Sequence, residues 1–315
     1  MAVSAQPPLV WQLARIGLVS AAPDRLAGFY ETALGFTRTG TAELGAPAAS
    51  ILAGRPVEGA RVVTLRLGEE VVELVGFSPA GAAALGDVPG WSPLFQHCAI
   101  IVSDMEAAVA RLSAQTGWQP ITEGGPQRLP DASGGVTAFK FRDPEGHPLE
   151  FLAFPAGRVP ALWQGRAGGP FLGIDHSAIS VADTEASRRF YARLGYRAAT
   201  GSHNHGPEQA RLDGIADPDL AVTGLVLPGQ GAPHIELLCY RGPLRGSFDR
   251  TAPLPSPTDA AATRLVLAMR DRAALEAACA ALSAHVVAPP ATQGEQAAAT
   301  LRDPDGHFLR LVAGV

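Results

Sequence analysis

The sequence is poor in cysteine, which excludes several small-domain architectures. Its 315 residues include only Cys98, Cys239 and Cys279, each within an apolar run. Three scattered cysteines argue against a disulfide framework or a zinc knuckle and favour reduced thiols in a cytoplasmic protein. We expect all three to be small core residues.

Charged residues and long apolar runs are also scarce. Charged residues make up 17% of the chain and the formal net charge is -5, so there is no global basic field and nucleic acid is not an expected partner. No apolar run is long enough to span a membrane, and the beginning of the chain, MAVSAQPPLVW, lacks the pattern of a signal peptide. With 47% hydrophobic residues, the chain is expected to be soluble and globular, with room for two domains.

The sequence does contain one motif twice. Residues 141–151 are FRDPEGHPLEF and residues 301–311 are LRDPDGHFLRL. The Asp-Pro-acid-Gly core suits a type I turn, and the alternating flanks predict strands, so each copy is predicted to be a β-hairpin. The copies differ in the second strand, where Glu150 of the first copy corresponds to Arg310 of the second.

The order strand, helix, strands is predicted four times along the chain. Helices are predicted at 25–34, 105–115, 184–194 and 272–283, with Asp24 and Asp104 as caps of the first two. Besides the two hairpins, strands are predicted at 13–20, 61–67, 71–77, 96–102, 174–181, 220–227, 235–240 and 264–269.

Two signatures indicate that half of the chain was duplicated. The helix ending Phe-Tyr…Leu-Gly occurs at Tyr30 and again at Tyr191, and the hairpin turn occurs at Asp143 and again at Asp303. The two separations are nearly equal, so each half already holds two modules. The predicted domains are 11–155, with modules 11–77 and 95–155, and 172–315, with modules 172–241 and 262–315. A Gly/Pro-rich linker is predicted at 156–171.

Four βαβββ modules, the Phe-Tyr…Leu-Gly helix endings and the Asp-Pro-x-Gly-His hairpins resemble the vicinal oxygen chelate superfamily. This superfamily includes glyoxalase I, extradiol dioxygenases, and fosfomycin- and bleomycin-resistance proteins. The resemblance covers roughly residues 13–312. It implies an α+β fold of two glyoxalase-like domains, whose curved mixed sheets enclose clefts. It also implies that metal ligands come from the first and last strands of the modules.

The resemblance assigns eight ligand positions, and neither half of the chain fills its own four. Arginine cannot lose its proton to bind a metal, and two arginines in the second half argue against the extradiol subgroup, which uses that half. Pairing modules two and three gives one complete site, as in fused glyoxalase I chains, and leaves a dismantled set in modules one and four. The complete set is His97, Glu150, His176 and Glu236, and the dismantled set is Arg15, Glu73, Arg264 and Arg310.

Two imidazoles and two carboxylates suit one divalent ion of Ni, Zn, Fe, Mn or Co with positions left for substrate oxygens. The resemblance therefore implies a glyoxalase-like isomerase or lyase. It would act on a small substrate with adjacent oxygens through a metal-bound enediolate, with Glu150 as the catalytic base. Two alternatives stay open. One is an Fe(II)-dependent dioxygenase of catechols or enediols that uses two histidines and one glutamate. The other is a non-enzymatic protein that sequesters a ligand, as bleomycin-resistance proteins do.

Other histidines have weaker signals. His203 and His205 fall in a predicted connection that would edge the cleft, and His234 shares the strand face of Glu236 and is expected at the rim. His147 and His307 occupy the turn of both hairpins, which favours a structural role.

Predictions can also be made for the dismantled set and for the oligomeric state. In that set, Arg15 and Arg264 are expected to pair with Glu73 or to bind an anion. The fused chain can complete a cleft as a monomer, and a homodimer stays open as an alternative. A small-molecule substrate is the only partner predicted.

Overall fold

The structure is a computed structural model that describes residues 8–82, 85–86, 88–166, 169–242 and 254–314. Residues 1–7, which bear on the signal-peptide expectation, lie outside the described part. Two residues of the predicted linker, 167 and 168, lie outside it as well.

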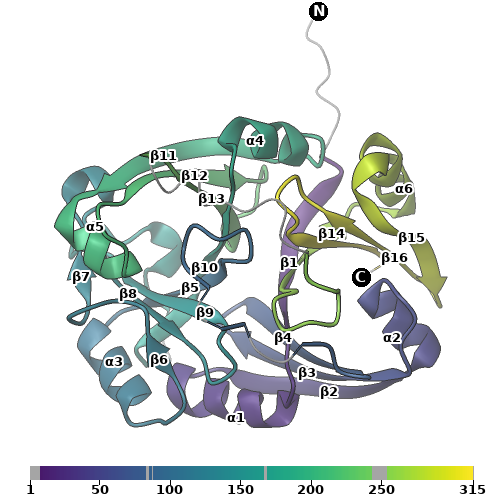
Figure 1. Cartoon of the computed structure of the whole chain (residues 1–315), viewed down its shortest axis with the longest axis horizontal. Helices are drawn as coiled ribbons and strands as arrows, with labels where there is room; N and C mark the ends of the chain where they lie inside the picture. Colours follow the sequence, from purple (N-terminus) through teal and green to yellow (C-terminus); the bar gives the residue numbers. More distant parts are fainter. Residues whose placement is uncertain (1–7, 83–84, 87, 167–168, 243–253, 315) are drawn as a thin grey trace, which may run out of the picture.

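Two large sheets form the molecule (Figure 1). The first has eight strands in the order β15-β16-β17-β14-β1-β4-β3-β2. Its strands are β1 (Val10–Val19), β2 (Thr37–Gly45), β3 (Gly59–Leu67), β4 (Glu70–Ser78), β14 (Arg264–Met269), β15 (Val286–Gln293), β16 (Gln296–Arg302) and β17 (Phe308–Ala313).

The second sheet has nine strands in the order β11-β12-β13-β10-β5-β9-β8-β6, with β7 paired to β8. Its strands are β5 (Gln96–Val102), β6 (Gln119–Pro120), β7 (Gln127–Arg128), β8 (Thr137–Arg142), β9 (Pro148–Ala153), β10 (Phe171–Ser180), β11 (Arg197–His205), β12 (Asp219–Val226) and β13 (His234–Tyr240).

Each sheet combines strands from both halves of the sequence. Antiparallel pairs β1–β14 and β10–β5 join the halves at the centre of the two sheets. The helices pack differently, because one core cluster holds residues of α1 (Pro23–Leu34) and α3 (Met105–Ser113), and another holds residues of α4 (Thr184–Ala192) and α6 (Arg272–Ala281). Sheets therefore cross between the halves, while these helix-side cores form mainly within a half.

The duplicated signatures connect a helix to the hairpin of the next module. The hydroxyl of Tyr30 donates to Asp143 Oδ2 at 3.1 Å, and the hydroxyl of Tyr191 donates to Asp303 Oδ2 at 3.2 Å. In the first turn, the amide of Gly146 donates to the carbonyl of Asp143 at 2.9 Å, which confirms the predicted turn. Gly146 has a φ of 94°, a conformation that favours glycine.

The histidine of each turn has a structural role, as expected. His147 is buried, with Nδ1 2.8 Å from Asp143 Oδ2 and Nε2 3.0 Å from the carbonyl oxygen of Val19. Nε2 of His307 lies 2.8 Å from the carbonyl oxygen of Ser180. Each ring therefore fastens a hairpin turn to the first strand of a neighbouring module.

Five strands and two helices were not predicted from the sequence: β2, β6, β7, β11, β15, α2 (Ala46–Ala53) and α5 (Gly206–Asp213). Strand β2 lies at a sheet edge and is exposed along most of its length, so it lacks the apolar alternation that marks a strand. The predicted cap Asp24 is also wrong, because α1 begins at Pro23, whose fixed φ suits a first helical position. Asp24 instead pairs with Arg61 at 2.9 Å. Asp104 does cap α3, accepting from the amide of Ala107.

All three cysteines are buried free thiols, as predicted. Among the described residues, the helices are too short or too polar to cross a membrane.

Candidate metal centre

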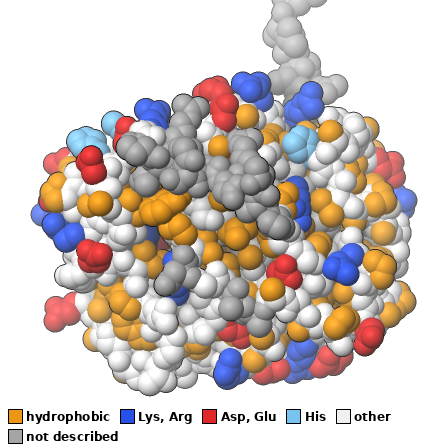
Figure 2. All heavy atoms as spheres, viewed as in Figure 1, with side chains coloured by type: hydrophobic (Ala, Val, Ile, Leu, Met, Phe, Trp, Pro, Cys, Tyr) orange, Lys and Arg blue, Asp and Glu red, His pale blue; other side chains and the backbone are white. Residues whose placement is uncertain are grey.

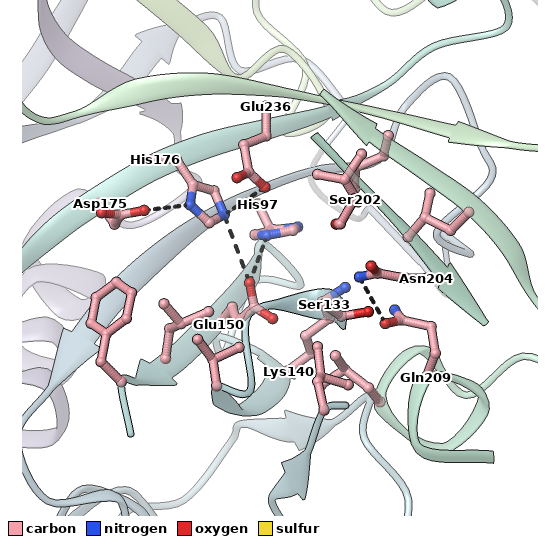
Figure 3. A pocket seen from close by; sticks show the side chains of 18 residues that line it. His97, Ser133, Lys140, Glu150, Asp175, His176, Ser202, Asn204, Gln209 and Glu236 are labelled. Atoms are coloured by element: carbon pink, nitrogen blue, oxygen red, sulfur yellow. Dashed lines mark hydrogen bonds and ion pairs between the residues drawn. The ribbon is translucent and has the colours of Figure 1, made fainter. Parts of the chain in front are cut away.

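The four predicted ligands meet on one face of the second sheet, where Figure 3 shows them pointing toward one another. His97 comes from β5, Glu150 from β9, His176 from β10 and Glu236 from β13. These four strands are neighbours in the sheet order β13-β10-β5-β9. One chain thus assembles the cluster from both of its halves.

Strand register explains why the four side chains converge. Ala99 is the cross-strand partner of both His176 and Glu150, and Ala178 is the partner of both His97 and Glu236. Directly paired residues project from the same face of a sheet. Two fully buried alanines therefore separate the ligands, and their short side chains leave room between them.

The distances within the cluster suit a shared cation. Nε2 of His97 lies 3.0 Å from Oε2 of Glu150. Nε2 of His176 lies 3.8 Å from the same oxygen and 3.4 Å from Oε2 of Glu236. His97, His176 and Glu150 are each at most 5% exposed. Buried imidazoles and carboxylates at these separations are typical of metal sites.

An unsatisfied ring nitrogen supports the fit. Nε2 of His176 is buried beside the two glutamates and makes no hydrogen bond. The other ring nitrogen, Nδ1, lies 3.0 Å from Oδ2 of Asp175. A carboxylate behind an imidazole fixes the ring orientation of a metal-ligating histidine. The donor set and the free Nε2 therefore fit a divalent transition metal held by His97, Glu150, His176 and Glu236.

The ionisation of the carboxylates also favours a cation. Burial acts to raise the pKa of Glu150, but the Lys140 ammonium and the two imidazoles lower it to about 2. For Glu236, His176 and His234 overcome burial and lower the pKa to about 2. Both side chains are therefore anionic near neutral pH.

The two imidazoles respond differently to the same surroundings. Burial lowers the pKa of His97. Burial acts in the same direction on His176, but Glu236 and Asp175 raise the pKa of this histidine to about 9. A protonated His176 thus balances the glutamates, and a bound cation would take the place of that positive charge.

A buried polar chain forms one side of the site. Lys140 is the cross-strand partner of Glu150, and its Nζ donates to Oδ1 of Asp213 at 2.7 Å. Oδ2 of Asp213 accepts from Gln209 at 2.7 Å, and Oε1 of Gln209 accepts from Asn204 at 3.1 Å. Burial acts to lower the pKa of Lys140, but Asp213 and Glu150 raise it, so the lysine stays charged.

The cluster opens into a cavity of about 190 Å³. Its polar lining beyond the four candidate ligands includes Ser133, Ser202, Asn204 and Gln209, and apolar side chains line much of the rest: Leu129, Val136, Leu152, Phe154, Leu212, Leu220, Val222 and Leu238. On the face shown in Figure 2, hydrophobic side chains gather near the middle, and charged ones lie mostly toward the margin. The lining of the cavity suits a small ligand with an apolar part.

Two of the three predicted rim histidines lie elsewhere. His203 and His205 belong to β11 and are exposed, and His203 Nε2 lies 2.7 Å from Asp219 Oδ1. Side chains alternate along a strand, so Ser202 and Asn204 line the cavity instead. The expectation that His203 and His205 edge the cleft is thereby corrected.

His234 does lie beside the cluster. It is the cross-strand partner of His176 in the parallel pair β10–β13, and its Nε2 lies 3.5 Å from Oε1 of Glu236.

Sequence reasoning missed Asp175 and Lys140. Asp175 directly precedes the candidate ligand His176, and this adjacency was its only signal. Lys140 lies between Phe139 and Phe141, a charge inside an apolar strand, which indicates a buried partner. The linker also contributes, because a hydrogen bond from Trp163 is among the interactions that lower the pKa of Asp175 against the effect of burial.

The dismantled set occupies the corresponding positions of the first sheet. Val266 pairs with Arg15 and Arg310, as Ala99 pairs with His176 and Glu150. Gly17 pairs with Glu73 and Arg264, as Ala178 pairs with Glu236 and His97. The sequence-based alignment of the ligand positions is therefore consistent with the strand register.

The expected pairings in this set are half right. Arg15 Nε lies 3.1 Å from Glu73 Oε1, as expected. Arg264 does not pair with Glu73. Its guanidinium donates to the carbonyls of Ala262 and Pro257 because it turns back toward its own preceding loop.

The comparisons agree with this architecture. The family model described as Glyoxalase/Bleomycin resistance protein/Dioxygenase superfamily matches residues 12–151 and again 173–311. The chain belongs to this superfamily and contains its domain twice. A comparison with curated proteins finds no match.

Solved structures resemble the chain over nearly its whole length. Glyoxalase I from Zea mays has a TM-score of 0.62 and 15% identity, and the match covers 95% of this chain and 91% of that one. A proposed dioxygenase from Bacillus subtilis subsp. subtilis str. 168 has a TM-score of 0.57 and 12% identity, with 98% and 86% covered. At these identities the likeness concerns the fold.

Proposed function

We propose that the protein is a metal-dependent enzyme that acts on a small substrate with adjacent oxygens by glyoxalase-like isomerase or lyase chemistry. The observation that carries this proposal is the convergence of His97, Glu150, His176 and Glu236 at one end of a partly apolar cavity. A divalent cation bound there would polarise the substrate oxygens and acidify the neighbouring C–H group.

Glu150 is the residue best placed to move a proton. It is an anionic carboxylate in the centre of the cluster, and its Oε2 is the atom that both histidines approach. We infer that Oε2 accepts a proton from the substrate carbon and returns it to the adjacent carbon, which is an isomerisation. Lys140 stabilises the carboxylate before the first transfer and after the second, and the aliphatic walls limit the access of water.

A second function is favoured by the geometry of three of the four residues. The ligand atoms of His97, Glu150 and His176 all lie within 4.8 Å of one another, whereas Glu236 also lies close to His234. Two histidines and one carboxylate form the pattern of non-haem Fe(II) oxygenases. An Fe(II)-dependent dioxygenase acting on a catechol or enediol is therefore the second candidate.

One pair of assays tests both functions on the same metal-loaded preparations. The first follows exchange of the C–H proton beside a carbonyl in D₂O by NMR, using α-hydroxyketones and the thiol adducts of 2-oxoaldehydes. The second follows oxygen uptake with catechols. Exchange without oxygen uptake supports the isomerase, and Glu150→Gln should slow this exchange about 10²-fold or more. Oxygen uptake by the iron-loaded protein, and by no preparation loaded with another metal, supports the dioxygenase. Loaded protein that shows neither activity would favour a ligand-sequestering role.

A further inference from the structure

The first sheet holds an unbalanced cluster of positive charge where the second sheet holds the four candidate metal ligands. Three guanidinium groups, those of Arg15, Arg264 and Arg310, lie at ligand-equivalent positions with a single carboxylate, Glu73. Only Arg15 pairs with this carboxylate, at 3.1 Å. Within the described residues, Arg264 and Arg310 have no carboxylate within ion-pair distance.

The hydrogen bonds of the two remaining arginines satisfy donors without neutralising charge. Arg310 Nη1 donates to the carbonyl of Ile51 at 2.6 Å, and Arg264 donates to two carbonyls. Arg264 also lies against aromatic rings, 5.3 Å from the centroid of Phe77 and 5.8 Å from that of Phe308. The Nε atom of Arg264 is buried and has no hydrogen-bond partner.

Burial makes this charge costly. Arg264 is 2% exposed, and burial together with the charge of Arg310 lowers its pKa to about 9. Burial lowers the pKa of Arg310 to about 10, with opposing effects of Glu73 and Arg15. Buried charges are normally paired, and a guanidinium binds carboxylate and phosphate oxygens through two parallel hydrogen bonds.

Solvent reaches part of the cluster. The side chains of Arg15 and Glu73 are 24% and 18% exposed, and Arg310 is partly exposed as well, whereas Arg264 is buried. A small anion can therefore approach Arg15 and Arg310, and the buried charge of Arg264 adds to the positive potential there.

We propose that Arg15 and Arg310, with the buried charge of Arg264 close to them, form a second ligand site, which binds the oxyanion of a small carboxylate or phosphate compound. Duplication would then have replaced a cation site by an anion site at the same register of the fold. Glu73 competes with the ligand for Arg15, so it weakens binding. The site is independent of the function proposed for the metal centre.

Titration calorimetry of the metal-free full chain tests this site. Sodium phosphate and sodium succinate are the probes, and sodium chloride at matched ionic strength is the reference. We expect saturable binding of at least one probe, and Arg310→Gln should weaken it at least tenfold, since hydrogen bonds to charged groups contribute about 1.5–3 kcal/mol. Arg188→Gln is the matched control, because Arg188 is an exposed arginine paired with Glu185 on α4.

Glu73→Gln tests the proposal with an expected change in the opposite direction. It removes the competing carboxylate and should tighten binding, and this result holds even if Arg310→Gln fails to fold. His176→Ala should leave binding unchanged, because that residue lies in the other sheet. The proposal is overturned if neither probe binds above chloride, if Glu73→Gln does not tighten binding, or if His176→Ala abolishes it.

Discussion

Nδ1 of His176 lies 3.0 Å from Oδ2 of Asp175, so the residue that precedes a candidate ligand also fixes its ring. Asp175→Asn should keep the fold and weaken metal binding about 10–100-fold, because removing a carboxylate behind a ligating histidine has effects of this size. Competition with a chromogenic chelator measures the affinity. Asp219→Asn is the control, since it removes the carboxylate beside the exposed His203. Equal affinities for the two variants would contradict the role of Asp175.

The Lys140–Asp213 pair is expected to be important for stability. Both side chains are at most 5% exposed and their charged atoms are 2.7 Å apart. Asp213→Asn leaves a buried ammonium without its partner and should lower the free energy of unfolding by about 3–5 kcal/mol. Urea denaturation measures the change. Glu185→Gln, in an exposed pair, should change stability by less than about 1 kcal/mol. If Asp213→Asn also lowers the free energy of unfolding by less than about 1 kcal/mol, the buried Lys140 ammonium does not need Asp213 for its stabilisation.

His147 predicts a pH dependence of stability. Both ring nitrogens face oxygen acceptors, and although burial acts to lower its pKa, Asp143 overcomes this effect and raises it. A folded-state pKa above the unfolded value of about 6.5 gives stabilisation that is complete below this value. The stabilisation is lost as the pH rises through the folded-state pKa.

The comparison of wild type with His147→Asn isolates this contribution. The difference between their free energies of unfolding should be larger at pH 6 than at pH 9. Urea denaturation at both pH values provides the measurement. A difference that stays constant, or grows at alkaline pH, would mean that the imidazolium form is not the stabilising one.

Ala99 is predicted to keep the metal site open. Its counterpart in the dismantled set is Val266, which is 1% exposed. Ala99→Val adds two methyl groups between His176 and Glu150 and should weaken metal binding at least tenfold, because a packed interior has little space for added volume. Equilibrium dialysis measures the affinity, and Ala42→Val on exposed β2 is the control. Unchanged metal binding in Ala99→Val would contradict the spacing argument.

The sequence was informative about the modules and about the ligand positions. The Asp-Pro-x-Gly-His turns and the Phe-Tyr helix endings repeat, so they could be aligned without a structure. Arg310 aligns with Glu150, and this difference indicated which pair of modules lacks a complete set of ligand residues. The structure agrees, because Ala99 and Val266 hold the same register in the two sheets.

The wall of the cavity was not predictable in the same way. Ser202 and Asn204 lie on β11, and Gln209 lies on α5, two elements without an apolar pattern that the sequence could reveal. Polar residues on an edge strand resemble a connection, so His203 and His205 attracted attention in place of their inward-facing neighbours. Asp213 could not be assigned to Lys140 either, because long-range pairs leave no local signal.

Metal content tests the central claim most directly. The measurement is elemental analysis of untagged protein for the wild type, His97→Ala, His176→Ala and the surface control His205→Ala. We predict about one divalent transition metal per chain in the wild type and in His205→Ala, and loss of most of it in the other two variants, because one histidine from each half is needed. A wild type without metal, or variants at His97 and His176 that retain it, would contradict a single site shared by the two halves.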